Sequence, residues 1–250
     1  MSDRILEVRD LTKSYGAIMA SRRLCLDIDR GEVHALIGPN GAGKTTAINQ
    51  LSGDILPDSG SIVFDGVEIS RMPPHRRARL GLARSFQITS IFDDLTVEEN
   101  LALAIIAHAG HNFRFWRNCL KTPLVQRELP AALERVDLDR QAGTIARSLS
   151  HGEKRQLEVG MALTGRPKLL LLDEPTAGIN PTLINGLIDR LRRANSELGV
   201  TLLVIEHNMR VIMNLAHRIT CLAHGQVLAE GTPDEVRDDR RVLDAYLGVA

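Results

Sequence analysis

The chain has 250 residues, of which 44% are hydrophobic and 25% charged, an ordinary composition for one large domain or for a domain with a smaller lobe. Its 31 basic residues balance 31 acidic ones, so no global field attracts nucleic acid or an anionic membrane. Three widely spaced cysteines form neither a metal-binding pattern nor a disulfide framework, which is typical of a protein of the reducing cytosol.

The sequence predicts no segment that crosses a membrane. Residues 1–10 lack the charged-then-apolar layout of a signal peptide. The most apolar long stretch, Leu101–Ala109, is about half as long as a membrane span. We therefore expect the chain to act at a membrane only where a partner holds it.

The N-terminal part predicts antiparallel strands. Leu6–Asp10 and Leu24–Ile28 are expected to be short strands, joined by a loop that contains Tyr15. Further along, Asp65-Gly66 separates two short apolar runs, and this dipeptide supplies the positive φ of a tight hairpin turn. Together these signals predict an N-terminal antiparallel β region.

Between those strands, residues 38–46 have the sequence GPNGAGKTT, in which a glycine and four free positions precede Gly-Lys-Thr. The apolar run Val33–Ile37 predicts a buried strand before this motif, and Ala47–Leu51 suits the start of a helix after it. This context is what the motif needs to be a phosphate-binding loop. Backbone N–H groups then converge on an anion, Lys44 supplies a point charge, and the Thr45 hydroxyl can ligate Mg²⁺. The alternative is a chance glycine-rich turn.

A cluster of basic residues follows Pro73-Pro74 and consists of Arg76, Arg77 and Arg79. We interpret these arginines as the solvated face of a helix. A patch that binds phosphate or lipid is the alternative interpretation.

The pattern then changes to helices. Thr96 and Glu99 have the spacing of a capping box just before an apolar run, and Leu124–Val136 predicts a second helix. We expect residues 88–165 to form a helical lobe inserted within a single domain of residues 1–250.

Ser150 and Gly152, in the stretch LSHGEKRQL, lie at the predicted N-terminus of another helix. A hydroxyl, a backbone N–H group and the helix dipole could all face an anion there. Taken alone, however, a serine at this position is explained by helix capping.

The strand–helix alternation of an α/β fold returns near the C-terminus. Lys168–Asp173 and Thr201–Ile205 are apolar runs typical of parallel strands buried on both faces, and Pro181–Leu198 predicts the helix between them. Ile219–Ala229 predicts a hairpin, and Thr232 has the features of the cap of a last helix.

Two adjacent acids, Asp173 and Glu174, follow a run of four leucines at the C-terminal end of a predicted strand, where open α/β sheets bind ligands. Such charges are costly beside a buried run unless something uses them. Asp173 is suited to bind Mg²⁺ through a water, and Glu174 to orient or deprotonate an attacking water. The alternative is that a carboxylate merely caps the next helix.

The order of these motifs resembles the ATPase subunit of ATP-binding cassette (ABC) transporters along essentially the whole chain. The elements that carry the resemblance are residues 38–45, Gln87, Leu149–Glu153, Leu169–Glu174 and His207. It implies an α/β P-loop NTPase core with a mixed sheet, the N-terminal antiparallel β region and the helical lobe. The stretches SFQITSIF, EHNM and AYLG are similar to the subfamily that energises uptake of branched-chain amino acids, with urea and amide importers close by.

The resemblance also implies the site residues for ATP and Mg²⁺. Tyr15 would stack on adenine, and the loop residues that hold ATP would be Gly38, Asn40, Gly41, Gly43, Lys44, Thr45 and Thr46. The residues expected at the metal are Thr45, Gln87 and Asp173. The residues expected in catalysis are Glu174, His207 and Gln87, with His207 bonded to the γ-phosphate and holding Glu174 in position.

The same resemblance implies that Ser150, His151, Gly152 and Glu153 form a signature that acts in trans, on ATP bound by a second cassette. This signature usually has the sequence Ser-Gly-Gly-Gln, so His151 and Glu153 are departures. Asn180 is a third departure, at a position where the family often has aspartate.

The partners implied are a second ATPase subunit, integral membrane permease subunits and, indirectly, a periplasmic or extracellular solute-binding protein, but no nucleic acid. The chain would then lie on the cytoplasmic face of the inner (plasma) membrane. Ile88, Ile91 and Phe92 are apolar candidates for contact with a permease, although core packing explains them equally well.

Other functions are weighed against this one. An ATPase of a lipopolysaccharide-export complex fits the same motifs and size. A soluble cassette acting on nucleic acid or the ribosome would need a coiled-coil insertion or a second cassette in tandem, and a non-catalytic scaffold would not need the intact set of residues.

Overall fold

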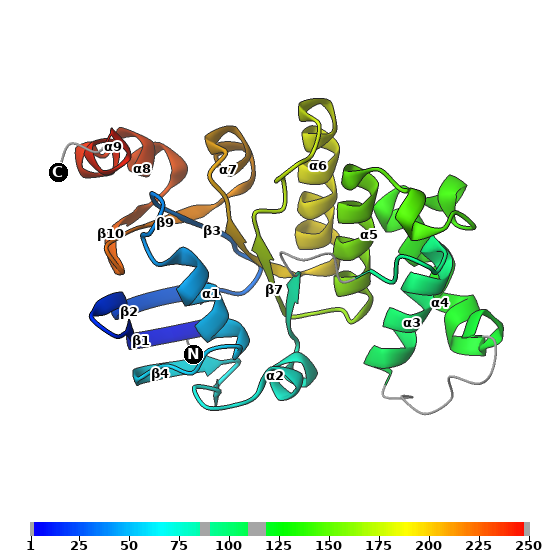
Figure 1. The fold of residues 1–250 in the computed structure, drawn as a ribbon, viewed down its shortest axis with the longest axis horizontal. Helices are drawn as coiled ribbons and strands as arrows, with labels where there is room; N and C mark the ends of the chain where they lie inside the picture. Colours follow the sequence, from blue (N-terminus) through cyan, green and yellow to red (C-terminus); the bar gives the residue numbers. More distant parts are fainter. Residues whose placement is uncertain (1–2, 86–90, 110–118, 248–250) are drawn as a thin grey trace. The chain divides into compact units, whose positions relative to one another are not determined.

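The computed structural model describes residues 3–85, 91–109 and 119–247 (Figure 1). It divides into two compact units. The first consists of Met1–Arg84, Lys168–Pro175 and Asn195–Ala250, and the second of Ser85–Pro167 and Thr176–Ala194. The boundaries predicted for the inserted lobe, residues 88–165, stay a prediction.

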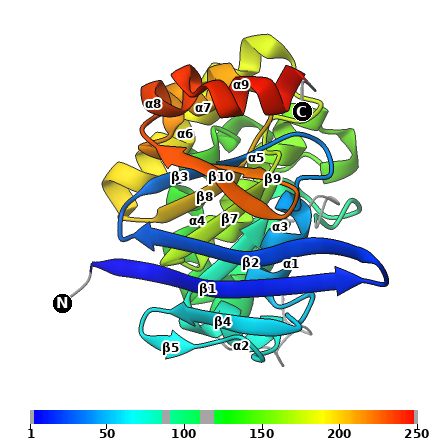
Figure 2. The same cartoon turned by 90° about the vertical axis from the view of Figure 1, so that its left-hand side faces the viewer.

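The first unit begins with an antiparallel sheet. Its strands are β1 (Arg4–Tyr15), β2 (Ile18–Asp29), β4 (Ser59–Phe64) and β5 (Val67–Glu68), in the order β2-β1-β4-β5 (Figure 2). Strands β1 and β2 pair up to Tyr15 and Ile18, so the prediction that Tyr15 lies in a loop is wrong. The hairpin predicted at Asp65-Gly66 is confirmed, with φ of 50° and 77° at these two residues.

A six-stranded mixed sheet forms the rest of the α/β core. Its strands are β3 (Val33–Ile37), β6 (Leu82–Ser85), β7 (Leu169–Asp173), β8 (Thr201–Ile205), β9 (Arg218–Ala223) and β10 (Gln226–Gly231), in the order β10-β9-β3-β8-β7-β6. Neighbouring strands from β9 to β7 are parallel, and β10 is antiparallel to β9. Every residue of β3, β7 and β8 is buried, as the apolar runs predicted.

Helices cover both faces of the mixed sheet within this unit. They are α1 (Lys44–Ser52) on one face and α7 (Met209–Leu215), α8 (Pro233–Asp238) and α9 (Arg240–Leu247) on the other. Helix α2 (Pro74–Leu80) lies beside the antiparallel sheet, near β4 and β5 (Figure 2). One apolar core joins α1 and the antiparallel sheet to the mixed sheet. The other joins Ile37 and Ile219 to Ile212 of α7, Val236 of α8 and Val242 of α9. Figures 1 and 2 show these last three helices on the side of the mixed sheet away from β1 and β2.

The second unit is helical. It contains α3 (Val97–His108), α4 (Pro123–Val136), α5 (His151–Thr164) and three short 3₁₀ turns, and α6 (Pro181–Leu198) contributes residues to both units. The capping box predicted at Thr96 and Glu99 is confirmed: the N–H of Glu99 donates to Thr96 Oγ1 at 3.2 Å, and the N–H of Thr96 donates to Glu99 Oε2 at 2.8 Å. Among the described residues, no helix has both the length and the apolar character needed to cross a membrane.

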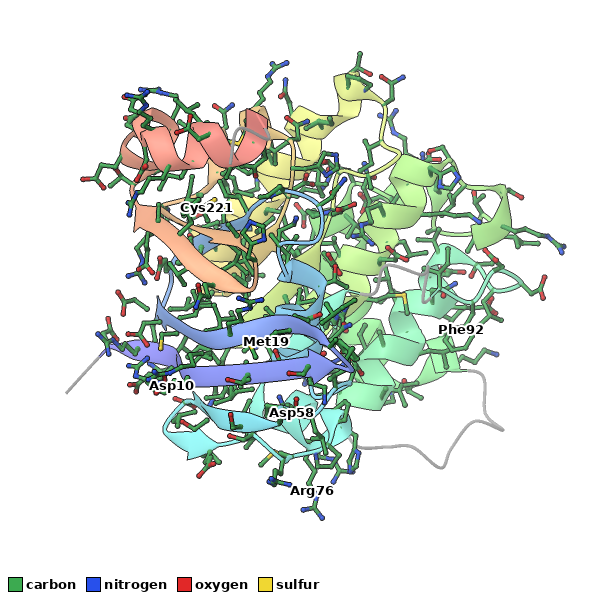
Figure 3. All side chains as sticks on the ribbon, turned by 60° about the vertical axis from the view of Figure 1, so that its left-hand side comes forward. Asp10, Met19, Asp58, Arg76, Phe92 and Cys221 are labelled. Atoms are coloured by element: carbon green, nitrogen blue, oxygen red, sulfur yellow. The ribbon has the colours of Figure 1, made fainter. Side chains whose placement is uncertain are left out.

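The arginine cluster of α2 differs from its prediction. Arg76 and Arg79 are exposed, and Figure 3 shows Arg76 at the outer edge of the molecule. Arg77 is fully buried, so the interpretation as a solvated face is wrong for this residue. Its guanidinium donates to backbone carbonyls, including those of Gln50 and Leu51 in the last turn of α1, both at 2.7 Å. These carbonyls have no partner within the helix, and the buried cation supplies one.

Candidate nucleotide-binding site

Residues 38–46, the predicted phosphate loop, run from the end of β3 into the first turn of α1. Gly43, which precedes α1, has a left-handed backbone with φ of 100°. The first turn of α1 contains no acidic residue and Gly43 provides no side-chain cap, so no side chain of the helix's own first turn occupies its N-terminal N–H groups. This arrangement matches the strand–loop–helix context predicted for a phosphate-binding loop.

Two glycines of the loop are required by close backbone contacts. A Cβ atom on Gly38, where φ is 147°, would lie 2.2 Å from the carbonyl oxygen of Leu222 in β9. One on Gly43 would lie 2.3 Å from the carbonyl oxygen of Ala20 in β2. The loop is therefore fixed against the ends of two strands, which a side chain at either glycine would push apart.

Lys44 is the first residue of α1, and its side chain turns back to the start of the loop. Its ammonium group donates to the carbonyl oxygens of Gly38 and Pro39, at 2.7 and 3.0 Å. Burial lowers the pKa of Lys44, and the negative charges of Glu174 and Asp173 oppose this shift. The cation is thus placed between the loop and the acid pair.

The remaining loop residues present polar groups to solvent. Asn40, Gly41 and Thr45 are exposed and Thr46 is partly buried. Tyr15 is also exposed, at the end of the β1–β2 hairpin whose Ala20 lies against Gly43. Its ring is 5.8 Å from Lys13 Nζ, measured to the ring centroid. An exposed aromatic ring on the strand pair beside the loop is suited to stacking on a base.

The acid pair lies where β7 ends. Asp173 is only 1% exposed, and Arg84 Nη2 lies 3.4 Å from its Oδ2 atom. Arg84 also donates to Asn49 Oδ1 near the end of α1 and to Asp54 Oδ2, both at 2.7 Å. The guanidinium group therefore connects Asp173 to the C-terminal end of the helix that follows the loop.

Glu174 is the first residue beyond β7 and adopts a left-handed backbone, with φ of 47°. Its N–H group donates to the carbonyl oxygen of Ile205 at 2.9 Å, and its side chain is 37% exposed. His207, which follows β8, places Nδ1 3.7 Å from Glu174 Oε1. A non-glycine residue in this conformation is strained, and such strain is concentrated at functional sites.

These groups meet at one edge of the sheet. Strands β3, β8 and β7 are consecutive and parallel, so the loop, His207 and the acid pair all follow carboxyl ends on the same side. This is the edge at which open α/β sheets bind ligands.

The predicted signature lies in the helical unit, at the start of α5. Ser150 is the N-cap and accepts from the N–H of Glu153 at 3.3 Å. The carboxylate of Glu153 in turn accepts from both the N–H and the hydroxyl of Ser150, at 2.8 and 2.7 Å. His151 is exposed and Gly152 is buried. The glutamate that departs from the family pattern therefore completes a capping box.

Two protein families match this chain. The family described as "ABC transporter" matches residues 21–177, and the family described as "Branched-chain amino acid ATP-binding cassette transporter" matches residues 226–250. The chain belongs to the ABC transporter ATP-binding cassette family.

Individual relatives of this cassette match along their entire length. The high-affinity branched-chain amino acid transport ATP-binding protein BraF of Pseudomonas aeruginosa is 40% identical over 257 aligned positions, which cover 100% of both chains. LivG of Escherichia coli, described in the same words, is 35% identical over 257 positions and is likewise covered completely. The crystal structure of the ADP conformation of MJ1267, an ATP-binding cassette of an ABC transporter, superposes with a TM-score of 0.87 at 28% identity, over 98% of this chain and 99% of that one.

The comparisons confirm the predicted resemblance and the predicted fold class. The cassette is an ATP-binding subunit whose ATP hydrolysis is coupled to transport. The roles of its individual residues stay predictions.

The other residues predicted from the sequence are Gln87, the permease-contact candidates and Asn180. Gln87 and Ile88 lie outside the described residues. Ile91 is buried in the apolar core of the helical unit, so of the two interpretations core packing holds for it. Phe92 is 54% exposed and remains available to a partner (Figure 3). Asn180, the third departure, accepts from the N–H of Thr182 at 3.1 Å, at the start of α6.

Two residues at the site were not anticipated from the sequence. Arg84 belongs to no motif, and only its position three residues before Gln87 could have drawn notice. Tyr246 belongs to the AYLG stretch, but nothing in that stretch indicates that its hydroxyl accepts from the N–H of Gly38 at 2.9 Å.

Proposed function

We propose that this cassette energises the uptake of branched-chain or related amino acids through separate membrane permease subunits. The observation that carries the proposal is its similarity to branched-chain amino acid transport proteins over the full length, which includes the family match of residues 226–250. The cassette would work at the cytoplasmic face of the membrane, held there by the permease, with a solute-binding protein delivering the amino acid on the other side.

The phosphate loop would hold the triphosphate. Backbone N–H groups at the start of α1 would donate to the phosphate oxygens, and Lys44 would exchange its two carbonyl acceptors for them. Tyr15, exposed beside the loop, would stack on the adenine ring.

The residues present fit a magnesium ion bound together with ATP. Thr45 and Asp173 offer a hydroxyl and a carboxylate, the hard oxygen ligands that Mg²⁺ prefers, and Gln87 would add an amide oxygen. Within the described part of the chain no three His, Cys, Asp or Glu side chains cluster. When bound, the magnesium ion would neutralise charge on the β- and γ-phosphates.

Hydrolysis requires that a water oxygen bond to the γ-phosphorus, that the bond to the oxygen of the leaving ADP break, and that the water lose a proton. Glu174 would accept this proton, because its carboxylate is partly exposed at the sheet edge near Lys44. His207, 3.7 Å from that carboxylate, would orient it and donate a hydrogen bond to the γ-phosphate.

A second cassette would complete the site. Ser150 and Gly152 at the start of α5 would contact the γ-phosphate held by the partner's loop, so that ATP stabilises the dimer and hydrolysis releases it. The exposed Phe92 would contribute to the contact with a permease.

The substrate class is tested with the cassette in complex with the membrane proteins that co-purify with it, reconstituted in liposomes. ATPase activity is expected to rise at least threefold when a binding protein loaded with leucine, isoleucine or valine is added. The unloaded binding protein is the control. Stimulation by urea, an amide or lipopolysaccharide instead would contradict amino-acid uptake while leaving the ATPase assignment in place.

The signature offers a second test, Glu153→Gln. In the native chain the carboxylate occupies both donors of Ser150, where it would compete with an incoming γ-phosphate and repel it. A glutamine keeps a capping oxygen without the charge, so ATP-dependent dimerisation is expected to strengthen about 3- to 10-fold. Sedimentation of the dimer, measured in a Glu174→Gln background that does not consume ATP, gives the dissociation constant.

Ser150→Ala in the same background is the companion variant. It is expected to weaken the dimer at least tenfold while leaving ATP binding to the isolated monomer unchanged. Equal dimerisation of Glu153→Gln and its parent would contradict competition between this carboxylate and the γ-phosphate. Equal dimerisation of Ser150→Ala and its parent, or loss of monomer binding in Ser150→Ala, would contradict a signature that acts in trans.

A further inference from the structure

The last helix contacts the first glycine of the phosphate loop. Tyr246 of α9 accepts a hydrogen bond from the N–H of Gly38 at 2.9 Å, across 208 positions of the sequence. Val242, one turn earlier on the same face of α9, is buried in a core that also contains Ile37, the residue before Gly38. The helix thus packs in the same core as β3 and reaches the loop through the Tyr246 hydroxyl.

Gly38 is restrained through both of its backbone polar groups, which belong to the two successive peptide units on either side of its Cα. Its N–H donates to Tyr246, and its carbonyl accepts from Lys44 Nζ at 2.7 Å. Its Cα packs so closely on the carbonyl of Leu222 that no side chain fits. Although Tyr246 is 41% exposed as a whole, desolvation raises the pKa of its hydroxyl, which therefore stays neutral and serves as an acceptor at neutral pH.

We propose that Tyr246 is a positioning residue for nucleotide binding, whose hydroxyl oxygen holds the Gly38 N–H and with it the start of the phosphate loop in the conformation that receives ATP. This inference rests on the proposed role of residues 38–46. It extends the site to α9, a helix that no nucleotide-binding motif includes.

The contact with Tyr246 matters because Lys44 is expected to change partners when ATP binds. When its ammonium group turns to the phosphates, the Gly38 carbonyl loses its donor, and the hydrogen bond that the Gly38 N–H donates to Tyr246 remains as the side-chain restraint on this residue. The turn between β9 and β10 braces the other end of the loop, where the N–H of Gly225 donates to the carbonyl of Ala42 at 3.0 Å. A loop that is already held in its binding conformation loses less conformational entropy when the nucleotide binds, so its affinity is higher.

The test is Tyr246→Phe, which keeps the ring and removes only the acceptor. The matched control is Leu243→Ala, a change at an exposed apolar residue of the same helix. Tyr246→Phe is expected to weaken binding of ADP and of a non-hydrolysable ATP analogue about 3- to 10-fold. It should raise KM for ATP by a similar factor with kcat nearly unchanged. Hydrogen exchange of the Gly38 amide, followed by NMR in the absence of nucleotide, should accelerate at least tenfold.

A purely structural role would lower the melting temperature without this split between KM and kcat. Unchanged exchange at Gly38, or an affinity equal to that of Leu243→Ala, would overturn the inference even if the wild type binds ATP normally. If the wild-type chain itself did not bind ATP, the proposed function would be overturned as well. Binding by the wild type therefore distinguishes failure of this inference from failure of the proposed function.

Discussion

Glu174→Gln is expected to bind ATP with unchanged affinity and to lose at least 100-fold in turnover. The amide has nearly the same shape as the carboxylate but cannot take a proton from the attacking water, and a positioned general base contributes about 10²- to 10⁴-fold. The left-handed backbone at position 174 is unaffected, because the N–H bond to the Ile205 carbonyl does not involve the side chain. Binding and chemistry should therefore separate cleanly in this variant.

Two measurements check this result. Equilibrium binding of ATP to the isolated chain should match the wild type, and sedimentation in ATP should show a dimer that persists, because ATP that is not hydrolysed continues to hold it together. Glu197→Gln, at an exposed acid of α6, is the control for charge alone. If Glu174→Gln kept more than a tenth of the wild-type ATPase rate, another group would have to be the base.

The parts of the site that the sequence predicts are those in which chemistry demands particular residues close together. A phosphate loop needs small residues, a lysine and a hydroxyl within nine positions, and the acid pair needs a buried strand directly before it. The strands themselves could be predicted because parallel strands buried on both faces are apolar at every position.

Contacts between distant positions of the chain could not be predicted in this way. Arg84 meets Asp173 across 89 positions, and Tyr246 meets Gly38 across 208. Each depends on strand order and on where a helix packs, which no local pattern encodes. Strand β1 is longer than the predicted Leu6–Asp10 for a different reason. Its last residues, including Lys13 and Ser14, are polar yet pair with β2.

The burial of Arg77 could not be predicted either, because neither its sequence neighbours nor its residue type indicates it. In sequence it is one of three neighbouring arginines, and a charged residue is seldom fully buried. In the structure its guanidinium donates to four backbone carbonyls, those of Met72, Gln50, Leu51 and Ser70, at 2.8, 2.7, 2.7 and 3.2 Å. Burial lowers the pKa of Arg77 to about 10, so the group remains charged at neutral pH. It thereby joins α2 to the end of the helix that begins at the phosphate loop.

Arg77→Met is therefore expected to destabilise the fold by about 3 to 5 kcal/mol, because it leaves buried carbonyls without donors. Urea unfolding at pH 7.5 measures this change as a lower midpoint. Arg76→Met, one position away on the exposed side of α2, should change stability by less than about 0.5 kcal/mol. Arg77→Lys should fall between the two, since three donors on one nitrogen cannot span four carbonyls. Equal midpoints for the Arg76 and Arg77 variants would show that the carbonyls find other donors and that α1 does not depend on this arginine.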